Sequence, residues 1–255
     1  MFARVVYLQC RRFLLSPVFW ICSVLLTVVL VINSNMAIPG REVGNDIVYA
    51  YDYAVMNTEA VVLSFLPALP FALSYMDEKK EHSLSLAYIR CDVDSFITAK
   101  FISVVLSGLC VSFLGNILYF LVMSSVLPVL CKSANISGAY GIDYLLEIGR
   151  PYVYLFATML CQALSASLFT ALTFFFSMFI REKYTVMVLP LLCYHIAFLA
   201  ESLTDRRLLR QYCIDVPNAI TPVGVVGKKL VFVLLVCLLV WVVSVKKAER
   251  DVLNG

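Results

Sequence analysis

Long apolar stretches separated by short charged segments dominate the chain. Asp, Glu, Lys and Arg are absent from residues 13–40, 60–76, 101–131, 151–180, 184–200 and 230–245. A helix needs about 20 residues to cross the roughly 30 Å apolar core of a bilayer. The three shorter stretches reach that length when Glu59, Glu201 or a snorkelling Lys228 or Lys229 is added at one end. The pattern predicts six transmembrane helices, at about 17–38, 57–76, 101–127, 153–180, 184–203 and 226–245.

The composition supports a membrane protein and excludes other classes. Apolar residues make up 62% of the 255 residues, charged residues only 15%, and the mean hydropathy is +0.90. These values do not describe a water-soluble or a disordered chain. A scattered net charge of +3 excludes a nucleic-acid partner. Alternating strands of the barrel type do not occur. We therefore expect an all-α membrane protein whose residues 1–255 form one transmembrane domain.

The N-terminal segment carries arginines between apolar residues. Phe2, Val5, Val6, Gln9 and Phe13 recur near helical spacing, with Arg4, Arg11 and Arg12 around them. This pattern is typical of a helix that lies in the membrane interface, and the alternative is a cytosolic extension of the first span. The apolar run is too long for a signal peptide, so we expect it to be retained.

The distribution of Lys and Arg predicts the orientation. With six spans both termini share one side, and placing them in the cytosol leaves twelve of the 20 Lys and Arg residues inside. Five of the remaining eight crowd into the last outer loop, so the bias is moderate. The sequence predicts a multi-pass membrane protein with both termini cytoplasmic.

The cytosolic segment 77–100 is charged at its start and amphipathic in its middle. Ser83 can cap a helix that presents Leu84, Leu86, Ala87 and Ile89. Asp92 or Asp94 can cap the third span, which Lys100 then anchors at the interface. The segment predicts a short surface helix between two spans. Such a helix either docks on a partner or simply lies on lipid.

This segment resembles the cytosolic loop of ABC-2-type transporter permeases. The family pattern runs approximately as Glu-x-x-Gly-Thr-Leu, a leucine-rich turn with Pro-x-Ser-Arg, and Gly-Lys. Glu81, Ser83, Leu84, Leu86 and Lys100 occupy matching places. The departures from the pattern are His82 for glycine, Cys91-Asp92 for the proline element and Ala99 for the last glycine. With the chain length, the six spans and the basic N-terminus, the resemblance extends over essentially the whole chain.

The resemblance implies the permease subunit of an ATP-driven exporter. Such a subunit forms half of a translocation pathway with a second copy or a related permease, and its coupling helix docks on cytosolic ABC ATPase subunits. ATP and Mg would be bound by that partner, so this chain is expected to be non-catalytic and to hold no cofactor or metal. Candidate cargos are peptides, drugs or other amphipathic compounds. The coupling residues would be Glu81, Ser83, Leu84, Leu86, Ala87, Ile89, Arg90 and Lys100.

Several residues within the spans are candidates for the pathway or a hinge. His195 is predicted to pair with Asn116 or Gln162, and the alternative is a proton or substrate site. Glu59 and Glu201 fall near outer ends, either lining a vestibule or facing the interface. Pro67 and Pro70 predict a kink in the second span that is either a hinge or a static bend.

Two further features concern packing and the outer segments. Small residues recur in two spans and predict close helix contacts; they are Gly108, Ser112 and Gly115 in the third span, and Ala163, Ser167 and Ala171 in the fourth. Cys131 and Cys213 both fall in outer segments, and the sequence gives no distance between them. It therefore leaves a disulfide between them open.

Other functional classes have weaker signals. An intramembrane hydrolase would need a nucleophile or metal motif such as Gly-x-Ser-x-Gly or His-Glu-x-x-His, and neither occurs. A secondary transporter would usually show internal repeats, and none is evident. Residues 224–229 contain glycines and lysines but fail the spacing of a phosphate-binding loop. A membrane protein that transports nothing, such as an immunity protein, remains the third alternative.

Overall fold

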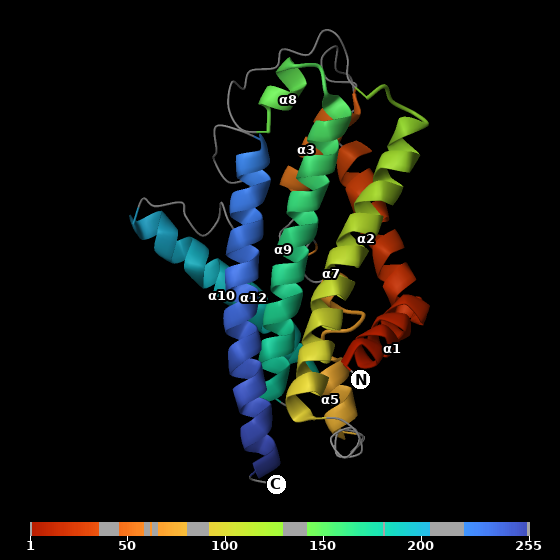
Figure 1. Cartoon of the computed structure of the whole chain (residues 1–255). Coiled ribbons are helices and arrows are strands. Elements are labelled where there is room, and N and C mark those ends of the chain that lie inside the picture. The colour runs from red at the N-terminus through yellow and green to blue at the C-terminus, as the bar shows by residue number, and fades with distance from the viewer. Residues whose placement is uncertain are drawn as a thin grey trace.

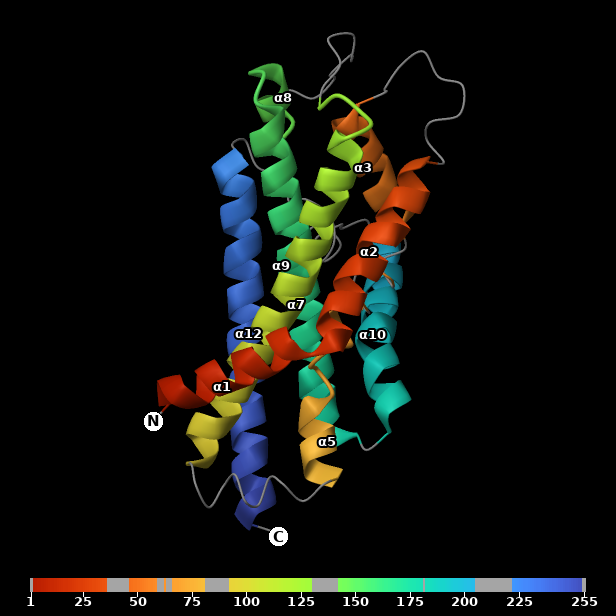
Figure 2. The ribbon, with the colours of Figure 1, turned by 90° about the vertical axis from the view of Figure 1, so that its right-hand side faces the viewer.

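Helices arranged as an elongated bundle make up the described part of the chain (Figures 1 and 2). The computed structural model describes residues 2–35, 46–58, 62, 66–80, 92–129, 142–180, 182–204 and 222–253. The helices in these ranges are α1 (Phe2–Leu15), α2 (Pro17–Asn35), α3 (Ile47–Asn57), α5 (Ser74–Lys80), α7 (Val93–Ser124), α8 (Tyr144–Glu147), α9 (Pro151–Phe179), α10 (Lys183–Thr204) and α12 (Pro222–Leu253). The α8 end of the bundle carries α3 and α8, and the opposite end, the α5 end, carries α5 (Figure 1).

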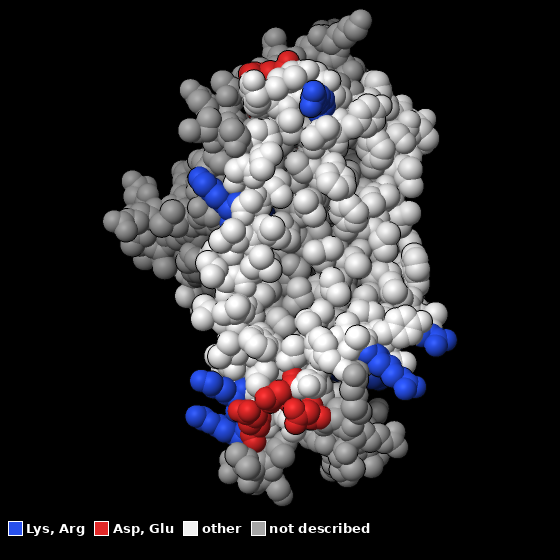
Figure 3. Space-filling view, in the orientation of Figure 1, with Lys and Arg blue, Asp and Glu red and all other residues white. Residues whose placement is uncertain are grey.

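Four helices are long and apolar enough to cross a membrane, and they suggest a multi-pass membrane protein. Their apolar parts are Pro17–Ser34, Val93–Ser124, Pro151–Phe179 and Pro222–Arg250. On the face in Figure 3, most charged side chains gather toward the α5 end, and the broad middle is largely free of them. The helical fold class is therefore confirmed for the described residues.

The predicted spans at 57–76 and 184–203 are not among these four helices. In the first of them, residues 59–61 and 63–65 lie outside the described part of the chain, and residues 69–73 form a turn before α5 begins. The second corresponds to α10, which packs on α9 and diverges from the bundle (Figure 1). The count of six spans stays a prediction.

Helix α9 is the centre of the bundle. In its apolar window 78% of the residues are buried, compared with 28% in the window of α12. Its Ser and Thr hydroxyls donate to backbone carbonyls one turn earlier, as Thr170 does to Ala166 at 2.7 Å and Thr173 to Phe169 at 2.8 Å. These bonds satisfy the hydroxyls where no water is present, so the helix remains compatible with an apolar environment.

Small residues let α7 approach two neighbours closely. A Cβ added at Gly108 would lie 2.8 Å from the Cβ of Thr170 on α9, and one added at Gly115 would lie 2.8 Å from Leu26 Cδ2 on α2. On α9 the predicted small-residue positions Ala163, Ser167 and Ala171 are all buried. Tight packing of this kind drives the association of helices in a bilayer, where the hydrophobic effect gives no driving force between them.

Helix α1 is a separate element and not an extension of the first span. It ends at Leu15, and Pro17 begins α2 after Ser16. A proline lacks the backbone N–H and restricts the residue before it, so a continuous helix is unfavourable there. In Figure 2, α1 lies across the bundle, and it packs on α7. The alternative of a cytosolic extension is therefore wrong.

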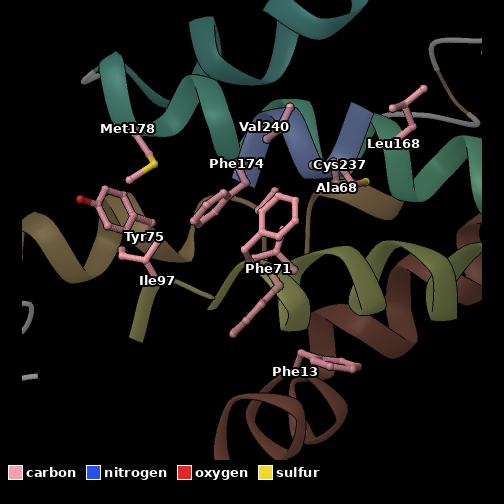
Figure 4. Close-up of a cluster of buried hydrophobic side chains, with 14 of the residues drawn as sticks. Phe13, Ala68, Phe71, Tyr75, Ile97, Leu168, Phe174, Met178, Cys237 and Val240 are labelled. Carbon is pink, nitrogen blue, oxygen red and sulfur yellow. The ribbon is translucent and has the colours of Figure 1, made fainter. Parts of the chain in front are cut away.

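Aromatic side chains fill the core at the α5 end (Figure 4). Phe13 from α1 packs on Phe71 with ring centres 6.0 Å apart, and Tyr75 from α5 packs on Phe174 from α9 at 5.9 Å. Both distances suit tilted or edge-to-face aromatic pairs. This cluster joins α1, the turn before α5, and α9 into one packed unit.

Close packing at Gly108 gives a testable prediction. Gly108→Ala places a methyl group against Thr170 and should lower the free energy of unfolding by about 1–3 kcal/mol, as overpacking typically does. Gly227→Ala is the matched control, because nothing lies within 4 Å of an added Cβ there. Alanine favours a helix over glycine, so that variant should be neutral or slightly stabilising. Thermal unfolding in detergent compares the two. Equal midpoints for both variants would contradict the close α7–α9 contact.

Candidate functional site: a charged junction at the α5 end

Five charged residues meet where α5 contacts its neighbours, and we call them the charged junction: Arg12, Asp77, Glu78, Lys100 and Lys183. Helix α5 starts after the turn at residues 69–73, and its Asp77 lies in the first turn and its Lys80 in the last, as the helix dipole favours. It ends at Lys80, immediately before the predicted coupling segment that begins at Glu81.

Glu78 is the buried centre of the junction. Its side chain is 8% exposed, and its Oε1 lies 2.5 Å from both Arg12 Nη1 on α1 and Lys100 Nζ on α7. Lys100 is completely buried, and its ammonium lies 5.1 Å from the ring centre of Phe71. An ion is costly to bury unless it is paired. One carboxylate therefore ties α5 to two other helices.

The burial of Lys100 corrects the prediction that it anchors a span at the interface. The ion pair with Glu78 lowers the cost of burying Lys100. Helix α7 continues for seven residues before Lys100 and starts at Val93 instead of 101. Asp92 occupies the N-cap position, but its side chain makes no capping hydrogen bond. The signal that sequence reasoning missed is the position of Glu78 and Lys100. They lie near the two ends of the charged segment 77–100, and each is next to an apolar run.

A second ion pair joins α5 to α10. Asp77 Oδ1 contacts Lys183 Nζ, and both side chains are less than half exposed, at 43% and 42%. Such an exposed pair contributes only about 0–1 kcal/mol. Asp77 and Lys183 also line a cavity of about 380 Å³ together with Arg12, Ser16, Pro70 and Ser74. Pro70 thus lies in the turn beside this cavity, and Pro67 lies in the helical turn at residues 66–68.

Most of the predicted coupling residues lie outside the described part of the chain: Glu81, Ser83, Leu84, Leu86, Ala87, Ile89 and Arg90. The same holds for three residues of other predictions, Glu59, Cys131 and Cys213. Of the coupling set, only Lys100 is placed, and it belongs to the charged junction.

The predicted pairing of His195 with Asn116 is wrong. Asn116 on α7 instead accepts a hydrogen bond from the Tyr51 hydroxyl at 3.0 Å and donates to the Ser112 carbonyl at 2.8 Å. His195 is exposed on α10, with its ring 5.5 Å from that of Tyr194. Gln162 is half-buried on α9 and Glu201 lies in α10. The partner of Asn116 came from α3, whose position relative to α7 has no sequence signature.

A smaller polar network lies at the α8 end. The Tyr154 hydroxyl on α9 donates to Asp52 Oδ2 on α3 at 2.8 Å. Burial raises the pKa of Asp52 to about 7; the bond from Tyr154 opposes this shift, and the negative charges of Asp143 and Asp46 add to it. Asp52 is therefore partly protonated near neutral pH. None of these residues was a sequence candidate.

One lysine is not where the span prediction placed it. Lys228 is exposed on α12, but Lys229 is completely buried. Only Lys228 is therefore positioned to snorkel toward an interface. Among the described residues, no group of three or more His, Cys, Asp or Glu side chains could hold a metal ion.

Comparison with known protein families, curated proteins and solved structures gave no match. The geometry of the chain itself is therefore the basis for a function. The charged junction can transmit a displacement of α5 to α1, α7 and α10, because charge-assisted bonds link α5 to each of these helices.

Replacing Glu78 should destabilise the bundle strongly. Glu78→Gln leaves Lys100 buried without a countercharge, which should cost about 3–5 kcal/mol. Asp77→Asn removes the neighbouring carboxylate from an exposed pair and should cost less than about 1 kcal/mol. Thermal unfolding in detergent measures both. Adding Lys100→Met to Glu78→Gln should recover much of the loss, and no recovery would argue against a direct Glu78–Lys100 dependence.

Asp52 should make stability depend on pH. Its pKa rises from 3.8 to about 7 on folding, so the folded state binds the proton more tightly. The free energy of unfolding should fall as pH rises from about 4 to about 7 and level off above that, with a slope of at most about 1.4 kcal/mol per pH unit. Unfolding midpoints across this window test the sign. Asp52→Asn should flatten the slope, whereas Asp94→Asn, exposed at the α5 end, should keep it.

Proposed function

We propose that the chain is the permease subunit of an ATP-driven ABC-2-type exporter. In this function it forms half of a translocation pathway, and a separate cytosolic ABC ATPase binds ATP and Mg. The resemblance of Glu81, Ser83, Leu84, Leu86 and Lys100 to the family loop supports the assignment. The observation that carries it furthest is the charged junction, because that junction joins the helix leading into this loop to the rest of the bundle.

The junction supplies a mechanical route from the loop to the membrane helices. Glu78 lies three residues before Glu81, and it holds α5 to α1 and α7 through one carboxylate oxygen. A loop that moves with a closing ATPase pulls directly on α5. A conformational change of this kind needs contacts that differ between two states. Ion pairs that exchange partners at a helix interface provide such contacts.

The proposed topology has six spans, with both termini and residues 77–100 in the cytosol of a bacterial cell. The described chain ends both lie toward the α5 end (Figure 2), the same end as the helix that leads into the loop. The second permease is another copy of this chain or a related subunit, and the pathway lies at their interface. Cargos are peptides, drugs or other amphipathic compounds.

Docking of the loop gives the decisive test. Leu84→Asp with Leu86→Asp places charges on the apolar face and should cost several kcal/mol of ATPase binding, because interface energy concentrates in a few buried side chains. The control Arg90→Gln changes a rim charge and should cost less than about 1 kcal/mol. Co-purification with a candidate cytosolic ABC ATPase, and the ATP turnover of the complex, measure both effects.

The orientation is checked in the same cells. A single cysteine introduced by Ser83→Cys in a cysteine-free background should resist membrane-impermeant reagents applied outside. Labelling from outside would remove the coupling argument. Intact assembly and cargo export in the double Asp variant would show that the loop only rests on lipid, in favour of a protein that does not couple to an ATPase.

A further inference from the structure

The cavity beside the charged junction has the size and position of a ligand site. It opens between the α1–α2 corner, the turn before α5 and the start of α10, and its volume of about 380 Å³ falls in the range of about 300–1,000 Å³ typical of ligand pockets. Arg12 and Ser16 line it from the corner, Ser74 and Asp77 from α5, and Lys183 from α10.

The charges around the cavity favour an anion. Among the charged side chains that line the cavity, the cations Arg12 and Lys183 outnumber the one carboxylate, Asp77. The Arg12 side chain is 57% exposed and contacts Glu78 through Nη1, so other guanidinium N–H groups can point into the cavity. Arginine forms paired hydrogen bonds to phosphate oxygens, and lysine binds phosphate as a point charge.

The rest of the cavity wall is apolar, and exposed apolar side chains flank Ser16 along the chain. Leu69, Phe71 and Leu73 add apolar surface to its wall. Leu14 and Leu15, next to Ser16, are 44% and 69% exposed, and Trp20 is 53% exposed. The Trp20 indole donates to the Leu14 carbonyl at 3.0 Å, which holds the ring at the corner. Exposed tryptophan and leucine beside arginine are typical of the depth at which lipid headgroups meet acyl chains.

We propose that this cavity binds the phosphate headgroup of an anionic phospholipid, with Arg12 and Lys183 on the phosphate and the acyl chains against Leu14, Leu15 and Trp20. The two cations belong to α1 and α10, so a bound headgroup bridges helices on opposite sides of α5. The site does not depend on the proposed transport function. It requires only that the α1–α2 corner lies at the membrane surface.

Lipid retention by the purified full-length chain tests the site. Native mass spectrometry after reconstitution in mixed vesicles of phosphatidylglycerol and phosphatidylcholine should show preferential retention of phosphatidylglycerol. Ser16→Trp fills the cavity and leaves every charge in place, and Lys183→Gln removes one cation. Lys183→Gln should lower that retention about tenfold because it removes a charge-assisted contact to the phosphate, and Ser16→Trp should lower it at least as much because it fills the space that the headgroup needs. Arg11→Gln is the matched control, since Arg11 is exposed on α1 but does not line the cavity.

Each outcome decides for or against the lipid. Unchanged retention in Ser16→Trp, with circular dichroism and unfolding like the parent chain, would overturn the proposal, and so would equal retention of the two lipids. A second experiment uses inorganic phosphate in place of the lipid and measures the unfolding temperature. If phosphate raises the unfolding temperature of the parent chain but not of Ser16→Trp, while phosphatidylglycerol has no effect, the cavity binds a free phosphate and the lipid assignment is wrong. A loss confined to Ser16→Trp and Lys183→Gln supports it.

Discussion

One buried carboxylate determines how the α5 end of this bundle is assembled. Glu78 is nearly inaccessible, and its one carboxylate contacts both the completely buried Lys100 and Arg12, whose side chain is 57% exposed. Leaving Glu78 or Lys100 buried without the other would cost several kcal/mol, so the helices that carry them, α5 and α7, are held together. The same carboxylate contacts Arg12 and so also joins α5 to α1. Of these three residues, Arg12 also lines the cavity, and Glu78 lies in the helix that precedes the predicted loop.

Elsewhere the bundle is held by close packing and local hydrogen bonds. Gly108 and Gly115 allow α7 to approach α9 and α2, and buried hydroxyls such as Thr27 bond to backbone carbonyls, in this case that of Gly115 at 2.9 Å. Apolar contact alone gives little preference between helix and lipid in a bilayer. Shape and hydrogen bonding therefore decide which helices meet. This explains why small and hydroxyl residues are concentrated on the buried surfaces of α7 and α9.

The two ends of the bundle have different chemistry. At the α5 end fully charged pairs connect four helices, whereas at the α8 end Tyr51, Asn116, Asp52 and Tyr154 form hydrogen bonds. The ion pairs at the α5 end suit a junction that transmits movement, because the attraction between two charges persists when the distance between them changes slightly. The arrangement at the α8 end responds to protonation, because burial brings the pKa of Asp52 to about 7.

The sequence alone determined the helical class, the four long apolar helices and their approximate limits, because length and hydropathy are local properties of a chain. It left open whether α1 was a separate helix or an extension of the first span, and it placed Lys100 at the membrane interface, whereas in the structure the helix ends before Pro17 and Lys100 is buried. It could not pair Glu78 with Arg12 and Lys100, Tyr51 with Asn116, or Asp77 with Lys183. Those partners lie on different helices, and helix faces that are apolar all round carry no periodic signal of their neighbours. Only the tertiary packing, where each buried polar group must find a partner, decided them.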